Sequence, residues 1–208
     1  MNVKEGYDAW SSRYDENENK TRDLEKTAAE LILSPYQFST VIEIGCGTGK
    51  NTAFLCSKAR TVLALDFSEK MIDRAKAKIG FPNVVFRVAD INEPWLVIAG
   101  STDLVCCSLV LEHIINLDHI YSQAARALKS GGLFYICELH PYKQYGGSKA
   151  RFQYNESLVV LPCYIHHIYE FMDTAFDNGF RCVGLKEWFD DGSELNPPRL
   201  ISFVFQKL

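Results

Sequence analysis

The sequence predicts a doubly wound, mostly parallel α/β sheet of seven strands, with helices on both faces and an antiparallel hairpin at its C-terminal edge. From about residue 40, short apolar segments of strand length alternate with longer segments of helical periodicity, which indicates parallel strands joined by crossover helices. The last two strand-like segments, 180–188 and 200–206, have no helix between them, so we expect an antiparallel pair there. A length of 208 residues fits a single domain.

The first half of this alternation has clear boundaries. The expected elements are strands at 41–44, 61–65 and 83–88 and helices at 51–59 and 68–79. The strands are short apolar runs that stop at polar or glycine-rich turns, as strands buried on both faces do. For the second helix, Ser68 is a suitable N-cap residue, and Met71, Ile72 and Ala75 follow at helical spacing.

The second half continues the pattern with one interruption. The expected elements are strands at 102–108 and 133–138 and helices at 117–128 and 164–177, followed by the closing pair of strands. Asn178 and Gly179 provide a stop signal for the second of these helices. The segment 141–163 is irregular, so we expect it to form an inserted lid or short additional strands.

Composition and charge exclude several classes of protein. The net charge is −4, with 22 basic and 26 acidic residues, which argues against a nucleic-acid partner. No apolar run approaches the 18 residues of a membrane span, and the first 20 residues lack the apolar core of a secretory signal, so we expect a cytoplasmic protein without a membrane partner. The seven cysteines include no C-x-x-C pair, and Cys106 and Cys107 lie in an apolar run. We expect them to be small buried hydrophobic residues, and we expect no metal site.

A cluster of glycines at the end of the first strand indicates a ligand site. Residues 41–49 read VIEIGCGTG, with Gly45, Gly47 and Gly49 at every second position. Glycines at this point let the backbone approach a ligand closely, and the next helix directs its free N–H groups to the same place. The spacing does not match the dinucleotide fingerprint G-x-G-x-x-G, and Asn51 after Lys50 excludes a P-loop. The loop is therefore typical of a nucleotide- or nucleoside-binding turn.

Two aspartates follow the next two strands. Asp66 ends the second strand and could accept both hydroxyls of a ribose, or it could cap the helix that starts near Ser68. Asp90 ends the third strand and could accept from an adenine amine, or it could cap its own loop. With the glycines in register, the ribose interpretation of Asp66 is favoured.

With these signals together, the sequence resembles the class I S-adenosylmethionine-dependent methyltransferases, and among them the small type 11 group that includes ubiquinone- and menaquinone-biosynthesis-like enzymes. The matching stretches are VIEIGCGTG (41–49), VLALDFSEKMIDRAK (62–76), VVFRVADI (84–91), DLVCCSLVLEHI (103–114) and LKSGGLFYICE (128–138). They occur in the order and spacing of that family and cover roughly residues 38–140. The resemblance implies a Rossmann-like fold and S-adenosyl-L-methionine as cofactor.

The resemblance also implies a set of cofactor-binding residues. They are Tyr14, Glu43, Gly45, Cys46, Gly47, Gly49, Asp66, Phe67, Asp90, Ile91, Ser108 and Leu109. Glu43 is expected near the amino group of the cofactor, Asp66 at the ribose hydroxyls, and Asp90 with Ile91 at the adenine. The resemblance further implies that Tyr14 belongs to an N-terminal element that would close over the cofactor.

The same resemblance suggests how the single domain is divided. Residues 1–36 would form a helical lid, 38–140 the cofactor-binding core, 141–163 a substrate-side insert, and 164–208 a helix and the final strand hairpin. Aromatic residues with Arg151 in the insert suit a flat or anionic acceptor, although a loop that covers apolar surface would have a similar composition.

The expected reaction is methyl transfer by in-line displacement to an oxygen or nitrogen of a small-molecule acceptor. The sulfonium is already activated, so a general base is needed only for a hydroxyl or a protonated amine. The candidate bases are His113 and His140 at carboxyl ends of strands and His167 at the start of the late helix, while His166 is expected on a solvated face. His113 could instead tie down its own loop.

Two other functions compete with this one. Tyr145 and Lys149 spell the Y-x-x-x-K of short-chain NAD(P)-dependent reductases, but the two glycines between them disfavour the helix that this pair requires. A non-catalytic nucleoside-binding module on the same fold is the second alternative. Amino-methylating nucleic-acid enzymes carry an N/D-P-P-Y/F sequence after the fourth strand, where this chain has Ser108-Leu109-Val110-Leu111. The identity of the acceptor and the oligomeric state stay open.

Overall fold

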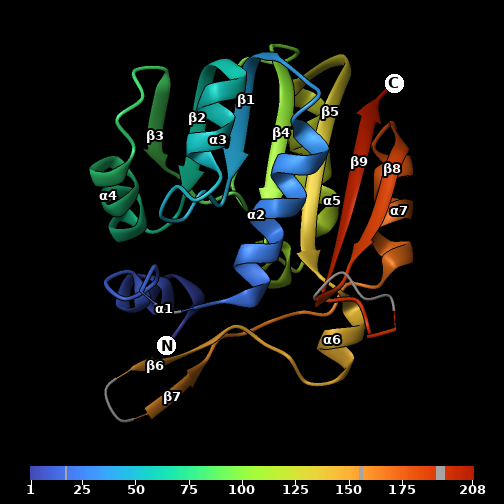
Figure 1. The fold of residues 1–208 in the computed structure, drawn as a ribbon. Coiled ribbons are helices and arrows are strands. Elements are labelled where there is room, and N and C mark those ends of the chain that lie inside the picture. Colours follow the sequence, from blue (N-terminus) through green and yellow to red (C-terminus); the bar gives the residue numbers. More distant parts are fainter. Residues whose placement is uncertain (17, 155–156, 191–194) are drawn as a thin grey trace.

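A central sheet has the strand order β3-β2-β1-β4-β5-β9-β8 in the computed structural model, which describes residues 1–16, 18–154, 157–190 and 195–208 (Figure 1). Its strands are β1 (Phe38–Ile44), β2 (Ala59–Asp66), β3 (Val84–Val88), β4 (Thr102–Ser108), β5 (Leu128–Leu139), β8 (Phe180–Trp188) and β9 (Leu200–Lys207). Strands β1 to β5 are parallel, and β9 runs antiparallel to both β5 and β8. The predicted fold class, with its antiparallel edge pair, is confirmed.

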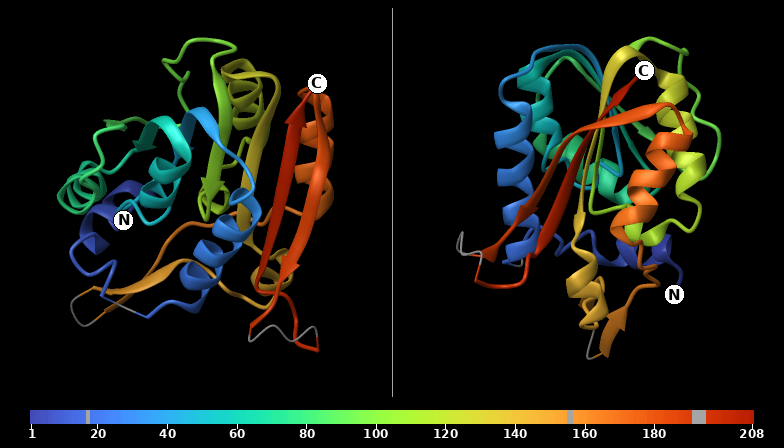
Figure 2. Two further views of the ribbon diagram at one scale, coloured as in Figure 1. Left: turned by 45° about the horizontal axis from the view of Figure 1, so that its top comes forward. Right: turned by 90° about the vertical axis from the view of Figure 1, so that its right-hand side faces the viewer.

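Helices cover both faces of this sheet. Figure 2 shows α2 (Lys20–Leu33) and α3 (Thr52–Lys58) on one face and α5 (Leu117–Ala127) and α7 (Ile168–Asp177) on the other. The fourth helix, α4 (Glu69–Lys78), packs through Ile72 on Ala64 of β2. Crossover helices on both faces bury both surfaces of the strands, which explains their continuous apolar runs.

Alternate residues of each strand belong to two different cores. In β4, Leu104 and Cys106 pack with α2 and α3, whereas Val105 and Cys107 pack with α5. Both cysteine side chains are at most 1% exposed. They fill space as small hydrophobic residues, as the sequence predicted.

The carboxyl ends of the parallel strands are covered by the N-terminus and the insert. Helix α1 (Val3–Trp10), helix α6 (Pro141–Tyr145) and the hairpin of β6 (Arg151–Tyr154) and β7 (Ser157–Val160) lie beyond these strand ends (Figure 1). Trp10 stacks on Phe152 with ring centroids 4.9 Å apart and an interplanar angle of 9°. Two segments far apart in sequence therefore form one layer over the edge where ligands bind in this class of sheet.

The late helix begins later than predicted. It starts at Ile168 rather than at residue 164, because His167 occupies the N-cap and its backbone N–H donates to the Glu170 carboxylate (2.5 Å). His166, expected on a solvated face, is instead buried, and its Nε2 lies 2.7 Å from the carbonyl oxygen of Ile114. That prediction was wrong because tertiary packing, not helical spacing, places this ring.

The structure also bears on the reductase alternative and on the prediction that no segment spans a membrane. Tyr145 is the last residue of α6 and Lys149 lies beyond its end, so this pair does not share a helical turn as the reductase motif requires. Within the described ranges, no helix is both long and apolar enough to cross a membrane.

Candidate functional site

The loop after β1 adopts a backbone that only glycine accepts readily. Gly45, Gly47 and Gly49 have φ values of +69°, +55° and +84°, in the left-handed region. A Cβ at Gly45 would lie 2.2 Å from Val110 Cγ2, whereas a Cβ at Gly47 would meet nothing within 4 Å. Gly45 therefore permits close packing behind the loop, and Gly47 leaves open space in front of it.

Asp66 holds this loop against the neighbouring strand. Its Oδ2 accepts from the backbone N–H of Gly47 (2.8 Å) and its Oδ1 from that of Ser68 (2.9 Å). The side chain is buried, and burial together with the nearby Asp8 carboxylate raises the pKa of Asp66 to about 6. Each carboxylate oxygen keeps a second lone pair, so Asp66 can both fix the loop and accept from a ligand.

A main cavity of about 570 Å³ opens at the carboxyl ends of four neighbouring strands. This volume is in the usual range for small-molecule sites. Nine of the predicted cofactor residues line it, namely Tyr14, Gly45, Gly47, Asp66, Phe67, Asp90, Ile91, Ser108 and Leu109. Tyr7 of α1 also lies on its wall. The topology thus brings together residues spread over nearly 100 positions of the sequence.

A small polar cavity of about 50 Å³ adjoins the loop on the side of α2. Two further predicted residues, Glu43 and Cys46, line it, together with Arg22, Glu25 and Asn51. Asn51 Nδ2 donates to Glu25 Oε1 (2.9 Å), and burial raises the pKa of Glu43 to about 8. Asn51 Oδ1 is buried without a hydrogen-bond partner among the described residues, so a donor from a ligand would complete its bonding.

Sequence reasoning did not find the α2 residues of this cavity. Glu25 lies in the helix with Ala28, Ala29 and Leu33, all of them buried. A carboxylate within a buried helical stripe is a recognisable signal, because burying it is costly unless it is paired. Gly49, the last predicted cofactor residue, lines none of these cavities and packs near Ile79.

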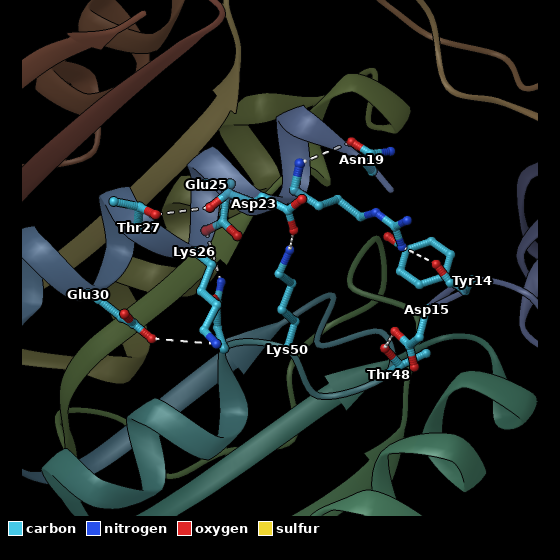
Figure 3. A network of polar contacts seen from close by, with 12 residues as sticks. Tyr14, Asp15, Asn19, Asp23, Glu25, Lys26, Thr27, Glu30, Thr48 and Lys50 are labelled. Carbon is cyan, nitrogen blue, oxygen red and sulfur yellow. Dashed lines mark hydrogen bonds and ion pairs between the residues drawn. The ribbon is translucent and has the colours of Figure 1, made fainter. Parts of the chain in front are cut away.

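Side chains from three segments fasten α2 over the glycine loop (Figure 3). Lys50 and Asp23 form an ion pair at 2.8 Å, and Thr48 Oγ1 donates to Asp15 at 2.7 Å. Asn19 caps the start of α2 by accepting from the Arg22 backbone N–H. The wall of the small cavity is therefore tied to the loop that forms its floor.

A second cavity of about 320 Å³ lies beside the main one and shares Tyr7, Tyr14 and Leu109 with it. Its other lining residues come from α1, from the start of α2, from the insert, from the turn after β4, from the end of β5 and from just before β9. They include Arg22, Glu112, Lys149, Arg151 and Arg199. A second concave space, lined by both polar and aromatic side chains, thus adjoins the main cavity.

Of the three histidine candidates, only His113 lines the main cavity. Its Nδ1 lies 2.8 Å from the carbonyl oxygen of Pro162, which can only accept, so Nδ1 carries the proton. Its Nε2 is then free to accept from the Tyr7 hydroxyl at 2.9 Å. Burial raises the pKa of Tyr7 well above its ordinary value, which keeps that hydroxyl protonated. His113 thus connects α1 to the turn after β4.

The other two histidines lie elsewhere. His140 is buried, its Nε2 lies 3.0 Å from Glu187, and its Nδ1 accepts from the Tyr142 backbone N–H. His167 is exposed and its Nδ1 lies 2.5 Å from the Tyr145 hydroxyl. Neither lines any of the three cavities described above, so the geometry offers them no contact with a reacting group there.

Glu112, His113 and Cys163 form a cluster whose potential ligand atoms lie within 4.8 Å of one another. Both ring nitrogens of His113 are already hydrogen-bonded, as described above. Burial raises the pKa of the Cys163 thiol to about 12, so the thiolate that metals prefer is disfavoured. These contacts favour a packing junction over a metal site.

Comparison with known proteins also indicates a methyltransferase domain. Residues 42–136 match the family model of the methyltransferase domain. Phosphoethanolamine N-methyltransferase 1 of Arabidopsis thaliana is 30% identical over 141 residues, which cover 64% of this chain and 28% of that protein. The chain thus spans about 28% of the length of this relative.

Solved structures share the fold. An S-adenosylmethionine-dependent methyltransferase from Mesorhizobium loti superposes with a TM-score of 0.75 at 19% identity, covering 88% of this chain and 98% of that one. The DhpI–SAH complex gives a TM-score of 0.74 at 20% identity over 98% of this chain and 94% of that one. Residues 42–136 of this chain therefore carry a methyltransferase domain, and the chain has the fold of the S-adenosylmethionine-dependent methyltransferases.

Proposed function

We propose that this protein binds S-adenosyl-L-methionine and methylates an oxygen or nitrogen atom of a small-molecule acceptor. The observation that carries the proposal is the main cavity, where the glycine loop and the buried Asp66 carboxylate face the same space. When bound, the cofactor supplies a methyl group on a sulfonium, which needs no further activation. Phosphoethanolamine in the name of a relative supports a nitrogen acceptor as one option.

The adenosyl part of the cofactor suits the main cavity. We assign the ribose hydroxyls to the unused lone pairs of Asp66, with Phe67 beside the adenine ring. Asp90 and Ile91 lie on the same wall and would meet the edge of the adenine. Asp90 Oδ1 already accepts from Asn92, so Oδ2 is the oxygen available to a base amine.

The methionine part suits the small polar cavity. Its ammonium group would complete the bonding of the buried Asn51 Oδ1 and lie near the Glu25 and Glu43 carboxylates. Its carboxylate would lie toward Arg22, which lines the same cavity. The hydrogen-bond acceptors and the arginine of this cavity thus suit the two polar ends of an amino acid.

The acceptor suits the second cavity, which meets the main one at Tyr7, Tyr14 and Leu109. The chain contributes mainly position and the exclusion of water, effects worth on the order of 7–11 kcal/mol in well-oriented systems. His113 acts here as a positioning residue, because it holds Tyr7 of α1 over the junction of the two cavities. Whether its Nε2 also accepts a proton during turnover is decided by the Tyr7 experiment below.

The direct test of the proposal is ligand stabilisation of the purified chain. At ligand concentrations about 100 times Kd, S-adenosylmethionine or S-adenosylhomocysteine should raise the melting temperature by about 5–10 °C. NAD(H) should have no effect. Stabilisation by NAD(H) alone would refute the proposal, and cofactor binding without turnover of any acceptor in a broad panel would favour the non-catalytic module.

Cofactor affinity should depend on the ionisation of Asp66. Burial raises its pKa to about 6, and the ionised carboxylate is the better acceptor for two hydroxyl donors. Affinity should therefore fall about tenfold between pH 7 and pH 5, because about nine-tenths of the group is protonated at pH 5. Calorimetry at several pH values measures this, and Asp66→Asn should bind weakly with a flat profile. Glu43 does not confuse the result, because with a pKa of about 8 it is already mostly protonated below pH 7.

Two glycine substitutions should separate binding from folding. Gly47→Val places a branched side chain in the open space before the loop, so it should weaken cofactor binding at least tenfold at a cost in stability of about 1–2 kcal/mol. Gly45→Ala adds a clash with Val110 to the same backbone strain, so its loss of stability should be larger. Urea unfolding and calorimetry measure the two effects. Equal stabilities of the two variants would contradict the packing described for Gly45.

Removing the Tyr7 hydroxyl should loosen the layer over the site. Tyr7→Phe deletes a hydrogen bond worth about 1 kcal/mol and leaves His113 Nε2 without its partner. We expect cofactor affinity to fall severalfold and the amides of α1 to exchange faster, while Tyr36→Phe, an exposed control, changes neither. A loss of turnover by orders of magnitude with unchanged cofactor affinity would instead give Tyr7 and His113 a part in proton transfer.

A further inference from the structure

We infer that the second cavity binds an anionic group, so that the methyl acceptor is a small molecule carrying a carboxylate or a phosphate. This inference rests on the proposed function for the role of the molecule, but the anion site itself can be tested without turnover. The cavity is the space of about 320 Å³ that meets the main cavity at Tyr7, Tyr14 and Leu109.

The charge of this cavity is opposite to that of the whole chain. The protein has a net charge of −4, yet the cavity is lined by Arg22, Lys149, Arg151 and Arg199 and, among its lining residues, by one acid, Glu112. A concave surface with cations in excess concentrates small anions from solution. An acidic protein has no need of such a surface for solubility, so a ligand is the simplest reason for it.

These cationic side chains differ in whether a carboxylate of the protein forms an ion pair with them. Arg199 pairs with both carboxylate oxygens of Asp190, and its Nη1 donates to Thr21 Oγ1 at 3.1 Å. For Lys149 and Arg151, no carboxylate lies within 4.0 Å in the part of the chain that the structure describes. Their charge is thus available to a ligand at the insert side of the cavity.

Glu112 would determine how a ligand is oriented in this cavity. Its Oε2 is buried without a hydrogen-bond partner among the described residues, so it would repel an anion and accept from an N–H or O–H donor. An acceptor molecule would therefore lie with its anionic group at Lys149 and Arg151 and with an amine or hydroxyl toward Glu112. Asn19, Thr21 and Ser148 add neutral polar groups along the wall.

The test measures anion binding by the full chain, with and without saturating S-adenosylhomocysteine. The probes are inorganic phosphate and succinate, with succinamide as the neutral twin of succinate. The test variant is Lys149→Gln with Arg151→Gln. The control is Arg60→Gln with Lys76→Gln, which removes the same charge from exposed positions on β2 and α4. All four positions are exposed, so both double variants should fold, and circular dichroism checks this.

Binding of phosphate, succinate or both is expected, with Kd raised about tenfold in the test variant and unchanged in the control. Phosphate alone would identify a phosphorylated acceptor, and succinate alone a carboxylate. Binding of neither anion, equal binding of succinamide, or equal weakening in the two double variants would overturn the inference. A chain that binds anions in this pattern but is not stabilised by S-adenosylhomocysteine would refute the proposed function and leave the anion site standing.

Discussion

The site depends on one buried carboxylate, that of Asp66. It accepts from the backbone N–H of Gly47 and of Ser68, and so joins the loop after β1 to the start of α4. Ser68 in turn donates through Oγ to Asp8 of α1 at 2.5 Å, so the layer over the cavity is tied to the same junction. Burial of this group is costly, as its raised pKa indicates, and the two N–H donors offset part of that cost.

Buried carboxyl groups also accept hydrogen bonds from neighbouring segments at the ends of two other strands. Glu43 on β1 accepts from the Thr52 hydroxyl of the next helix (2.5 Å), and Glu138 on β5 accepts from the backbone N–H groups of Val110 and Leu111 (both 2.9 Å). Burial raises the pKa of both carboxyls to about 8. Each side chain thus holds a neighbouring segment, the start of α3 for Glu43 and the turn after β4 for Glu138. Burying these acidic side chains at the carboxyl ends of the strands costs stability. In return the backbone around the cavities is held in place, which a binding site requires.

The parts of this arrangement that the sequence predicted are those that follow from local pattern. The periodicity of strands and helices predicted the sheet. The glycines predicted the binding loop, because a left-handed backbone restricts the residue type. The roles of Glu25 and Arg22 could not be read in the same way, since they depend on where α2 packs. His166 was misplaced because its ring is directed by the Ile114 carbonyl, a contact 52 positions away. Sequence patterns can identify residues at strand ends, but tertiary packing determines which helix completes the site.

The two cavities differ in what determines their shape. This difference explains why the sequence predicted the residues of the main cavity better than those of the second cavity. The floor of the main cavity is built on hydrogen-bonded parallel strands, whose register fixes the residues that follow each strand end. The second cavity lies largely between α1, the start of α2 and the insert, and the side chains of α1 and the insert pack on each other. Trp10 stacks on Phe152, and Gly6 lies so close to Leu161 that a Cβ there would be 2.3 Å from its Cδ2. Substitutions in either segment can therefore reshape the second cavity without disturbing the sheet. This packing permits a rigid main cavity for the proposed cofactor and a second cavity, shaped by side chains, for the proposed acceptor.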